Sequence, residues 1–286
     1  MNLRVFLGIA FLLFALTAEA QRDPVVIMQE LQKLNWQRGP SEGVIGPRAK
    51  IRVPEGYAFL DDKNTRRFLE LMGNPPRDNH YLIAPANLDW FAVFSFDPVG
   101  YVKDDEKIDA DKLLATLKES DGPGNEERKR LGMSPIYTDG WHVPPHYDAG
   151  TKRLEWGMRL RDEKGGLHVN YTSRLLGRSG VMSAILVSSP QTLGADMKAF
   201  NGALAGYDFV PGEKYAEFKS GDKIAEYGLA ALVVGGAAAA AAKAGLFKSL
   251  GKFIWVIIGG AAMGGWALLK RLLGRRETPP PGPGQT

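Results

Sequence analysis

The segment Leu154-Glu-Trp-Gly-Met-Arg-Leu-Arg161 alternates large apolar side chains with charged residues or glycine. This period of two is typical of a β-strand that has one face in the core. Glu163-Lys-Gly-Gly166 follows and predicts a tight turn, after which the chain returns as a second strand. The apolar residues of the returning strand are expected on the same face as those of the first strand: Leu167, Val169 and Tyr171.

The segments around this pair predict the rest of the sheet and the helices that cover it. A second turn at residues 176–180 leads to a third strand at 181–187. Further strands are expected at residues 49–53, 81–84 and 90–96. Helices are expected at residues 24–38, 61–72, 109–131 and 190–204, the third with a break at Asp121-Gly-Pro-Gly124. Strands and helices do not alternate strictly, which favours an α+β fold with an antiparallel sheet and packed helices.

The N-terminal residues have the features of an export signal. Arg4 precedes an apolar run, Val5 to Leu16, and Ala18-Glu-Ala20 supplies small residues for cleavage. We therefore expect a signal peptide at residues 1–20, with an uncleaved signal anchor as the alternative. The α+β domain, residues 21–227, would then be delivered across the bacterial inner membrane into the periplasm.

A C-terminal apolar block is expected to hold the protein in the inner membrane. Residues 253–269 are just long enough for one spanning helix, and two tryptophans lie near its ends. The residues expected to form this membrane anchor include Phe253, Ile254, Trp255, Trp266 and Leu269. The tail, residues 270–286, begins with basic residues and is rich in proline and glycine, and the positive-inside rule places it in the cytoplasm.

The first part of this block, residues 228–252, allows two topologies. Its alanines and glycines contribute little to membrane insertion, and Lys243 interrupts them. The segment either associates with the membrane beside a single span or forms the first helix of a helical hairpin. In a hairpin, small residues such as Gly235 and Gly236 would let the two spans pack closely, and the tail would face the periplasm. The single span is favoured.

Charge and composition exclude several classes of function. The net charge is +4, but the basic residues after Gly228 account for all of it, so the soluble domain is nearly neutral and a nucleic-acid partner loses its support. The absence of cysteine excludes thiolate nucleophiles, cysteine-ligated zinc and iron–sulfur clusters. No phosphate-binding loop or nucleophile motif is present, so no cofactor and no catalytic residue are predicted.

The most distinctive residues lie between the third predicted helix and the meander. A loop with two aromatic rings and two prolines is stiff, and stiff aromatics lose little entropy when they dock on a partner. The candidate recognition residues are Trp141, Pro144, Pro145, Tyr147, Asp148 and Trp156. The alternative, which carries more weight, is that these rings cap the core of the sheet.

Three polar residues of the same segment are weak candidates for a metal site. His142, His146 and Asp148 have side chains that zinc uses as ligands. Pro144 and Pro145 prevent a continuous helix that would place the two histidines on one face. Solvated or hydrogen-bonded histidines are therefore favoured over a metal site.

Several motifs of the mature chain together resemble those of a known bacterial family. They are Gly100-Tyr-Val-Lys-Asp-Asp105, Ile108-Asp-Ala-Asp-Lys-Leu-Leu114, Gly140-Trp-His-Val-Pro-Pro-His-Tyr-Asp148, Thr151-Lys-Arg-Leu-Glu-Trp156, Val169-Asn-Tyr171, Arg174-Leu-Leu-Gly-Arg178, Gly212-Glu-Lys-Tyr-Ala216 and Asp222-Lys-Ile-Ala-Glu-Tyr-Gly-Leu-Ala230. The family is one of predicted membrane-anchored envelope proteins, classed as domain of unknown function 2167. The resemblance implies an exported domain tethered to the inner membrane, and it brings no activity, cofactor or catalytic residue.

The sequence favours a non-enzymatic envelope protein over an enzyme. A tethered domain without a recognisable catalytic constellation is expected to bind an envelope protein partner, with the lipid bilayer as its second contact. A metal-assisted envelope hydrolase that uses His142, His146 and Asp148 is the alternative function.

Overall fold

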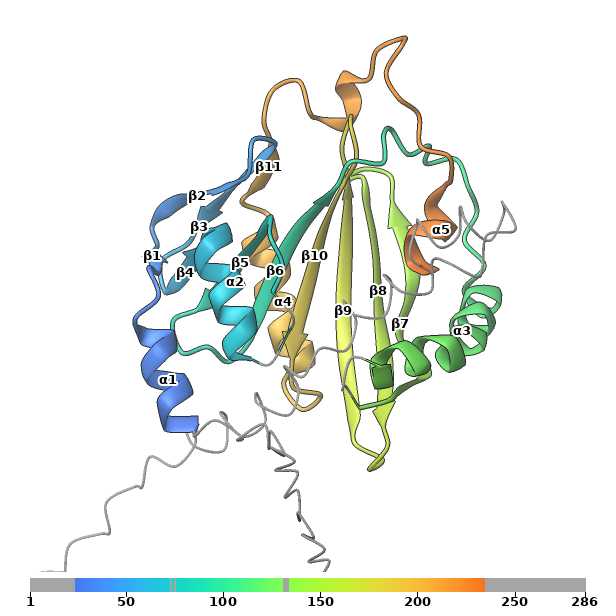
Figure 1. Cartoon of the computed structure of the whole chain (residues 1–286). Helices are drawn as coiled ribbons and strands as arrows, with labels where there is room; N and C mark the ends of the chain where they lie inside the picture. The colour runs from blue at the N-terminus through green and yellow to red at the C-terminus, as the bar shows by residue number, and fades with distance from the viewer. Residues whose placement is uncertain (1–23, 73, 75, 131–133, 235–286) are drawn as a thin grey trace, which may run out of the picture.

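A computed structural model of the chain describes residues 24–72, 74, 76–130 and 134–234 (Figure 1). Within this part, the larger sheet has eight antiparallel strands. Their order across the sheet is β1 (Gln37–Arg38), β4 (Tyr57–Leu60), β5 (His80–Pro85), β6 (Phe91–Asp97), β10 (Val181–Ser188), β9 (Leu167–Leu176), β8 (Arg153–Asp162) and β7 (Ile136–Asp148). The smaller sheet has the order β11 (Tyr207–Phe209), β3 (Ala49–Val53) and β2 (Ser41–Ile45).

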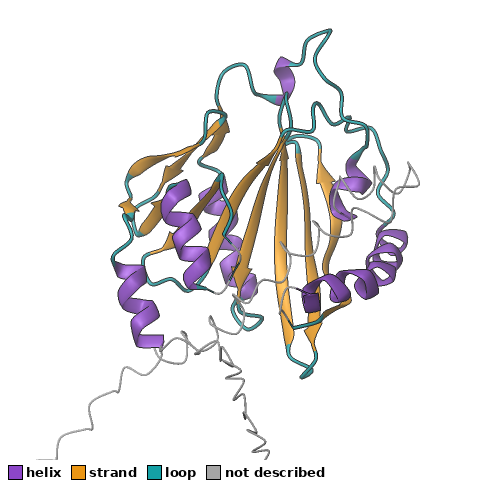
Figure 2. Ribbon diagram, viewed as in Figure 1, coloured by secondary structure: helices purple, strands orange, loops and turns teal. Residues whose placement is uncertain are grey.

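Helices cover both faces of the large sheet (Figure 2). The smaller sheet and α4 (Leu193–Leu204) pack on what we call the first face. The second face carries α1 (Pro24–Gln32) and α2 (Asp62–Leu71) at the β4–β6 end. At the β7–β8 end it carries α3 (Ala110–Arg130) and α5 (Leu229–Val234), and a short 3₁₀ helix, η1 (Tyr215–Glu217), lies in the loops that follow β11.

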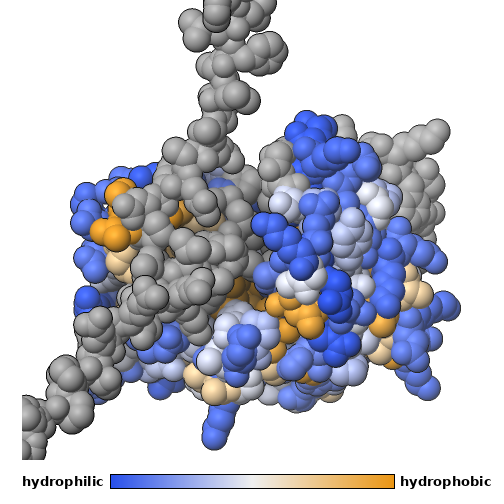
Figure 3. Space-filling view, turned by 90° about the horizontal axis from the view of Figure 1, so that it is seen from below, coloured by the Kyte–Doolittle hydropathy of each residue, from blue (hydrophilic) through white to orange (hydrophobic). Residues whose placement is uncertain are grey.

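The sheet divides the hydrophobic core into separate clusters on its two faces. On the first face, Phe94, Tyr171 and Phe200 are buried in one continuous cluster. On the second face, two separate clusters lie under the two groups of helices, one around Phe68 of α2 and one around Trp156 of β8. On the lower side of the molecule, apolar residues form small separate patches among hydrophilic ones (Figure 3). The described domain is therefore an α+β layered structure with a sheet buried on both faces.

Most of the predicted elements are confirmed. The strand predicted at residues 49–53 is β3, and the meander predicted from residue 154 onward is β8, β9 and β10. Helix α2 begins after Asp61, whose carboxylate accepts a hydrogen bond from the Asn64 backbone N–H at 2.9 Å, as expected for an N-cap. The α+β class with an antiparallel sheet is confirmed as well.

The prediction for the returning strand is wrong about the face. Leu160 of β8 lies opposite His168 of β9, and residues directly opposite each other share a face. Val169 and Tyr171 therefore point to the first face and join its core, whereas Leu160 belongs to the second. Leu167 is 43% exposed. Because both faces of this sheet are covered, apolar residues on neighbouring strands need not share one side.

The predicted break in the third helix is also wrong. Helix α3 runs through Pro123 without interruption. The Asp121 carboxylate accepts hydrogen bonds from the backbone N–H and the hydroxyl of Thr138, both at 2.8 Å. The Asn125 side chain donates to the Ile136 carbonyl at 2.9 Å and accepts from its N–H at 2.8 Å. These bonds to β7 stabilise the helical turns on both sides of Pro123. Hydrophobic periodicity along the sequence cannot predict such contacts with a distant strand.

The predicted recognition loop is a strand. Residues 136–148 form β7, the edge strand, with register shifts near Gly140, Val143 and His146 against β8. Prolines are tolerated on an edge strand because one of its sides needs no ladder hydrogen bonds. The pair Pro144-Pro145 lies within the register shift between Val143 and His146 and marks a bulge rather than the end of the strand.

Several predictions fall outside the described residues. These are the signal peptide at 1–20, the anchor at 253–269, the tail at 270–286 and residues 235–252 of the Ala/Gly segment. Of that segment, α5 is described, and it buries Leu229, Leu232 and Val233 in the second-face core. Among the described residues, no helix is both long enough and apolar enough to cross a membrane.

Candidate functional site

The two tryptophans among the candidate recognition residues pack in or against the second-face core. Trp156 is buried, with 5% of its surface exposed. Trp141 is half-buried against the same core, and its indole Nε1–H donates to the Ala110 carbonyl of α3 at 3.0 Å. Pro145 is buried and Pro144 is exposed. The structure thus uses the aromatic rings mainly to attach α3 to the edge of the sheet.

The metal candidates are spread along the exposed side of β7. His142 and His146 are both exposed, and His146 Nε2 lies 3.7 Å from Glu155 Oε2. Asp148 binds the turn that follows it: its Oδ1 accepts from the Gly150 N–H at 2.8 Å and its Oδ2 from the Thr151 hydroxyl at 2.8 Å. Within the part of the chain that is described, no three histidine or acidic side chains converge as metal ligands would.

A polar cluster lies on the first face beside α4. Glu155 Oε1 accepts hydrogen bonds from Arg153 and from the Ser173 hydroxyl, the latter at 2.5 Å. Arg153 also donates to Asn201 Oδ1 of α4 at 2.7 Å. Burial raises the pKa of the neighbouring Tyr171 to about 12, and the charge of Glu155 adds to this effect.

This cluster does not have the order of groups that activates a serine. A nucleophilic serine needs a base, usually histidine, that accepts its proton directly. Here the Ser173 hydroxyl donates to Glu155, and His146 lies on the far side of that carboxylate. The two charges of Arg153 and Glu155 compensate each other, and the bonds to Asn201 attach α4 to the sheet.

A second polar cluster lies at the upper end of the sheet in Figure 1, and we call it the end cluster: Tyr101, Asp104, Tyr147, Lys152 and Tyr215. Asp104 Oδ2 accepts from the Tyr147 hydroxyl at 2.7 Å and from Lys152 Nζ at 2.8 Å. The Tyr101 and Tyr215 rings stack with centroids 4.3 Å apart, and Lys152 Nζ lies 5.1 Å from the Tyr215 centroid. Three separate segments of the chain therefore meet here: residues 101–104, the end of β7 with its turn to β8, and η1.

The electrostatics of the end cluster favour one fixed protonation state. Burial raises the pKa of Asp104, but hydrogen bonds from Lys152 and Tyr147 outweigh burial and the pKa is lowered. Burial and the neighbouring Asp104 raise the pKa values of Tyr147 and Tyr215. These shifts favour the charged carboxylate and the neutral phenols, the forms in which Tyr147 and Lys152 both donate to Asp104 and clamp the loops together.

Two further contacts fix the loops around the end cluster. The Arg178 guanidinium donates to both oxygens of Asp222, each at 2.7 Å, and this bidentate pair lowers the pKa of Asp222 to about 2. Arg48 Nη1 donates to Ser179 Oγ and to Glu213 Oε1, both at 2.6 Å. The loop between β9 and β10 is thereby tied to the loops that follow β11.

The loop after η1 presents two apolar side chains above this clamp. Phe218 is 37% exposed, and its ring centroid lies 4.2 Å from that of Tyr101. Ile224 is 46% exposed and forms an isolated parallel bridge with Tyr101. Lys219 and Lys223 are exposed in the same loop. We call Phe218, Lys219, Lys223 and Ile224 the loop surface; Figure 2 shows these loops gathered at one end of the sheet.

Sequence reasoning reached only part of this arrangement. Tyr147 was a candidate recognition residue, and Tyr101, Tyr215 and Asp222 belong to motifs that carry the family resemblance. Phe218 and Ile224 were not predicted, because single apolar residues in a loop form no periodic pattern. Their one signal was their position inside or next to those motifs.

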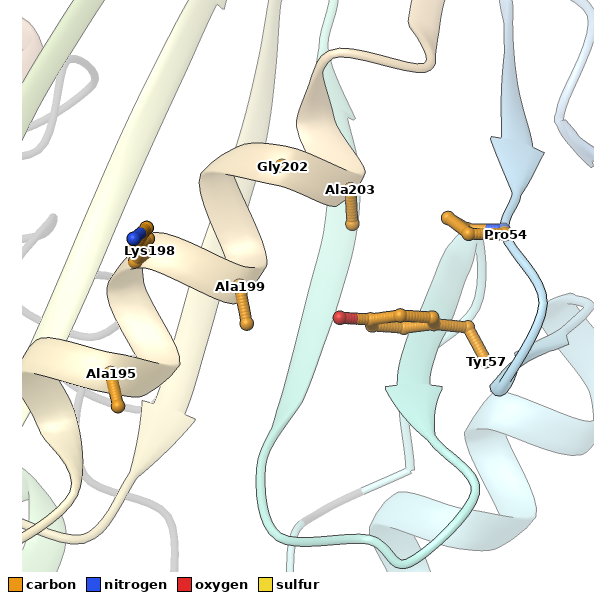
Figure 4. A pocket seen from close by; sticks show the side chains of 7 residues that line it. All are labelled: Pro54, Tyr57, Ala195, Lys198, Ala199, Gly202 and Ala203. Carbon is orange, nitrogen blue, oxygen red and sulfur yellow. The ribbon is translucent and has the colours of Figure 1, made fainter.

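An apolar hollow of about 410 Å³ lies on the first face of the sheet, beside α4 (Figure 4). Tyr57 and Pro54 form one wall, and small residues of α4 form the other, with Lys198 at the rim. The α4 residues that line it are Ala195, Ala199, Gly202 and Ala203. The polar side chains of its lining are Tyr57, whose hydroxyl points toward α4, and Lys198, and these two groups do not identify one ligand chemistry.

Comparison with known proteins identifies the family of the chain. The family described as "Protein of unknown function (DUF2167)" matches residues 37–264. No curated protein matches the chain. The solution structure of cyanobacterial PsbP (CyanoP) from Synechocystis sp. PCC 6803 is similar over 59% of this chain and 91% of that chain, with a TM-score of 0.35 and 10% sequence identity.

Proposed function

The chain belongs to the DUF2167 family, and we propose that it is an exported, membrane-anchored protein whose α+β domain binds a protein of the bacterial cell envelope through the loop surface. The signal peptide expected at residues 1–20 and the anchor expected at 253–269 support the envelope location. The single inner-membrane span would leave the domain in the periplasm.

The observation that carries the proposal is the preorganised loop surface. Phe218 and Ile224 are exposed, yet both are held against Tyr101. A loop that is already ordered loses little conformational entropy when it binds, and an exposed aromatic residue is a common centre of binding energy. Connecting loops are usually more mobile than the elements they join. The bonds that order this loop therefore support a role in binding.

The chemistry of the loop surface indicates the kind of partner. Two exposed lysines lie next to the two apolar residues, between them in the loop. A matching partner surface would insert an apolar side chain between Phe218 and Ile224 and place carboxylates near Lys219 and Lys223. We therefore expect an envelope protein with an acidic, partly apolar contact segment.

Site-specific photocrosslinking in intact cells tests this proposal. A photoreactive amino acid at Ser220, in the same loop, should yield one product of defined mass. The product should be lost in the variant Phe218→Ser/Ile224→Ser, because the apolar contact is removed, and weakened in Lys219→Glu/Lys223→Glu, because the charges are reversed. A crosslinker at Lys164, in the turn between β8 and β9 at the opposite end of the sheet, should not yield it.

The matched control replaces two exposed apolar residues elsewhere. Val44 and Leu167 are 59% and 43% exposed, so Val44→Ser/Leu167→Ser removes similar apolar surface and should leave the product intact. Circular dichroism and thermal unfolding confirm that each variant is folded. An undiminished product from folded Phe218→Ser/Ile224→Ser would refute the loop surface as the binding site, and crosslinks to lipid alone would refute a protein partner.

A further inference from the structure

A row of polar side chains crosses the second face of the large sheet. Arg174 of β9 lies opposite Ser183 of β10, and Ser183 lies opposite Ser95 of β6. On its other side Arg174 lies opposite Leu154, which belongs to the second-face core, so the whole row points to that face. We call Arg174, Ser183 and Ser95 the polar row.

Two neighbouring groups of the polar row are buried without a hydrogen-bond partner. Ser183 is 2% exposed, and neither its hydroxyl nor the Arg174 Nε–H has a partner. Arg174 Nη1 donates to Asp97 Oδ2 at 2.8 Å, which leaves the edge formed by Nε and Nη2 without an acceptor among the described residues. Buried polar groups normally have partners, so two adjacent ones without partners indicate that a bound group completes them.

The charges around the polar row favour a carboxylate as the bound group. The edge formed by Nε and Nη2 of an arginine binds a carboxylate through two parallel hydrogen bonds. Asp97 is the acidic neighbour, but half of its side chain is exposed and solvent screens its charge. Burial raises the pKa of Tyr227, and Tyr227 lies close enough to Asp97 and Arg174 that their charges also act on this pKa. The neutral phenol is therefore a further donor beside the row. At the far end His80 lies opposite Ser95, and burial lowers the pKa of His80, which favours its uncharged form.

An apolar strip continues from the polar row along β10. Ile185 and Val187 follow Ser183 on the same face, since side chains two positions apart in a strand point the same way. Val93 of β6 lies opposite Ile185, and all three apolar residues are half-buried. Figure 1 shows α2 on the β4–β6 side of this strip and α3 with α5 on the β7–β8 side, and none of the described helices is drawn over β10 on this face. The strip from Ser183 to Val187 is about 14 Å long, which matches an extended chain of about ten carbons.

We propose that the second face binds a monocarboxylate with an apolar tail, its carboxylate on Arg174 and Ser183 and its tail along Ile185 and Val187. The free edge of Arg174 donates two hydrogen bonds to the carboxylate and the Ser183 hydroxyl donates a third, so both unpartnered groups gain an acceptor. The tail removes apolar surface from water. A few polar groups that orient a ligand beside an apolar surface are typical of small-molecule sites. The site shares no residue with the loop surface and does not depend on the proposed partner.

Photolabelling of the full-length protein tests the proposal. The probe is decanoate that carries a diazirine near the end of its chain, and the protein is held in phosphatidylcholine nanodiscs. After irradiation, mass spectrometry of the peptides should find the label on the segment of β10 around Val187. Excess unlabelled decanoate should remove this label. Decan-1-ol at the same concentration should not, because it has the tail without the carboxylate.

Variants separate binding from folding. Arg174→Gln should raise the probe concentration for half-maximal labelling about tenfold, since it removes a charged pair of donors. Ser183→Ala should raise it about threefold, and it should not lower the melting temperature, because the hydroxyl that it removes is buried without a partner. The matched control is Arg159→Gln, which also removes an arginine from an aspartate, Asp139, but on the first face. Labelling of this variant should equal that of the parent protein.

Three results would overturn the proposal. One is competition by decan-1-ol as strong as that by decanoate, which would show an apolar surface that does not recognise a carboxylate. Another is equal labelling of the parent protein and of folded Arg174→Gln and Ser183→Ala, which would leave water as the partner of the two donors. The last is label that is absent from β6, β9 and β10, which would show that decanoate does not bind this face.

Discussion

At the scale of single residues, the ion pair between Arg178 and Asp222 determines how the loop surface is held. Each Asp222 oxygen accepts from a different nitrogen of the guanidinium, and Asp222 Oδ2 also accepts from the Lys219 backbone N–H at 2.7 Å. A carboxylate with several donors is stabilised in its charged form, which lowers the pKa of Asp222 from 3.8 to about 2.

This pair predicts a defined response to acid. Because the pKa of Asp222 is lower in the folded state, its contribution to stability is fully present above about pH 4 and is lost as the pH falls toward 2. Asp222→Asn should lower the urea midpoint of unfolding at pH 7, and the difference from the parent protein should shrink as the pH falls through this window. Asp105→Asn, an exposed aspartate of the same end, is the control. A difference that stays constant between pH 7 and pH 2 would contradict the role assigned to Arg178.

At the scale of secondary-structure elements, side-chain hydrogen bonds attach α3 to the edge strand. Asn125 satisfies both the N–H and the carbonyl of Ile136, at the N-terminal end of β7. An edge strand otherwise leaves one row of backbone groups without partners. Helix α3 thus protects β7 at this end through polar contacts and farther along through Trp141.

Removal of the Asn125 side chain should therefore destabilise the domain. Asn125→Ala breaks two hydrogen bonds to half-buried backbone groups, which we expect to cost about 1–3 kcal/mol in the free energy of unfolding. Glu126→Ala changes the adjacent, exposed position on the same helix and should have an effect within about 0.5 kcal/mol. Chemical denaturation of both variants measures the difference, and equal effects would show that α3 is held by its apolar face alone.

The same elements show what sequence patterns can and cannot predict here. Local signals, such as the Asp61 cap and the alternation from Leu154 onward, identified α2, β3 and the meander correctly. The patterns failed where the deciding contact is distant in sequence. Asp121 and Asn125 keep α3 continuous by bonding to β7, and the direction of Tyr171 depends on α4 covering the first face.

The candidate site was harder to predict for the same reason. Tyr101, Asp104, Tyr147 and Tyr215 converge only after the sheet has formed, and the hydrogen-bonded partners Tyr215 and Val102 are 113 positions apart in the sequence. Tyr147 was singled out as a stiff aromatic residue, but its role in binding Asp104 has no local signature. Trp141 and Trp156 stood out equally, and in the structure Trp156 is buried in the core under α3 while Trp141 packs against it.

At the scale of the whole molecule, the two ends of the sheet differ, and the proposed topology would use this difference. The loops of the end cluster lie at the end of the sheet opposite to the turn between β8 and β9. A single span at residues 253–269 would keep the entire described domain, and with it the loop surface, on the periplasmic side. A hairpin would also leave the domain in the periplasm, but it would place the tail in the periplasm as well.

Cysteine labelling of intact cells separates these topologies. Ser220→Cys, in the loop surface, should react with a membrane-impermeant maleimide once the outer membrane is made permeable, because the domain is periplasmic in the proposed arrangement. Gln285→Cys, near the end of the basic tail, should react only after the inner membrane is opened, since the positive-inside rule retains Lys270, Arg271 and their neighbours in the cytoplasm. Labelling of Gln285→Cys from the periplasm would establish the hairpin. Protection of both cysteines until the inner membrane is opened would refute export itself, and the partner would then have to be sought in the cytoplasm.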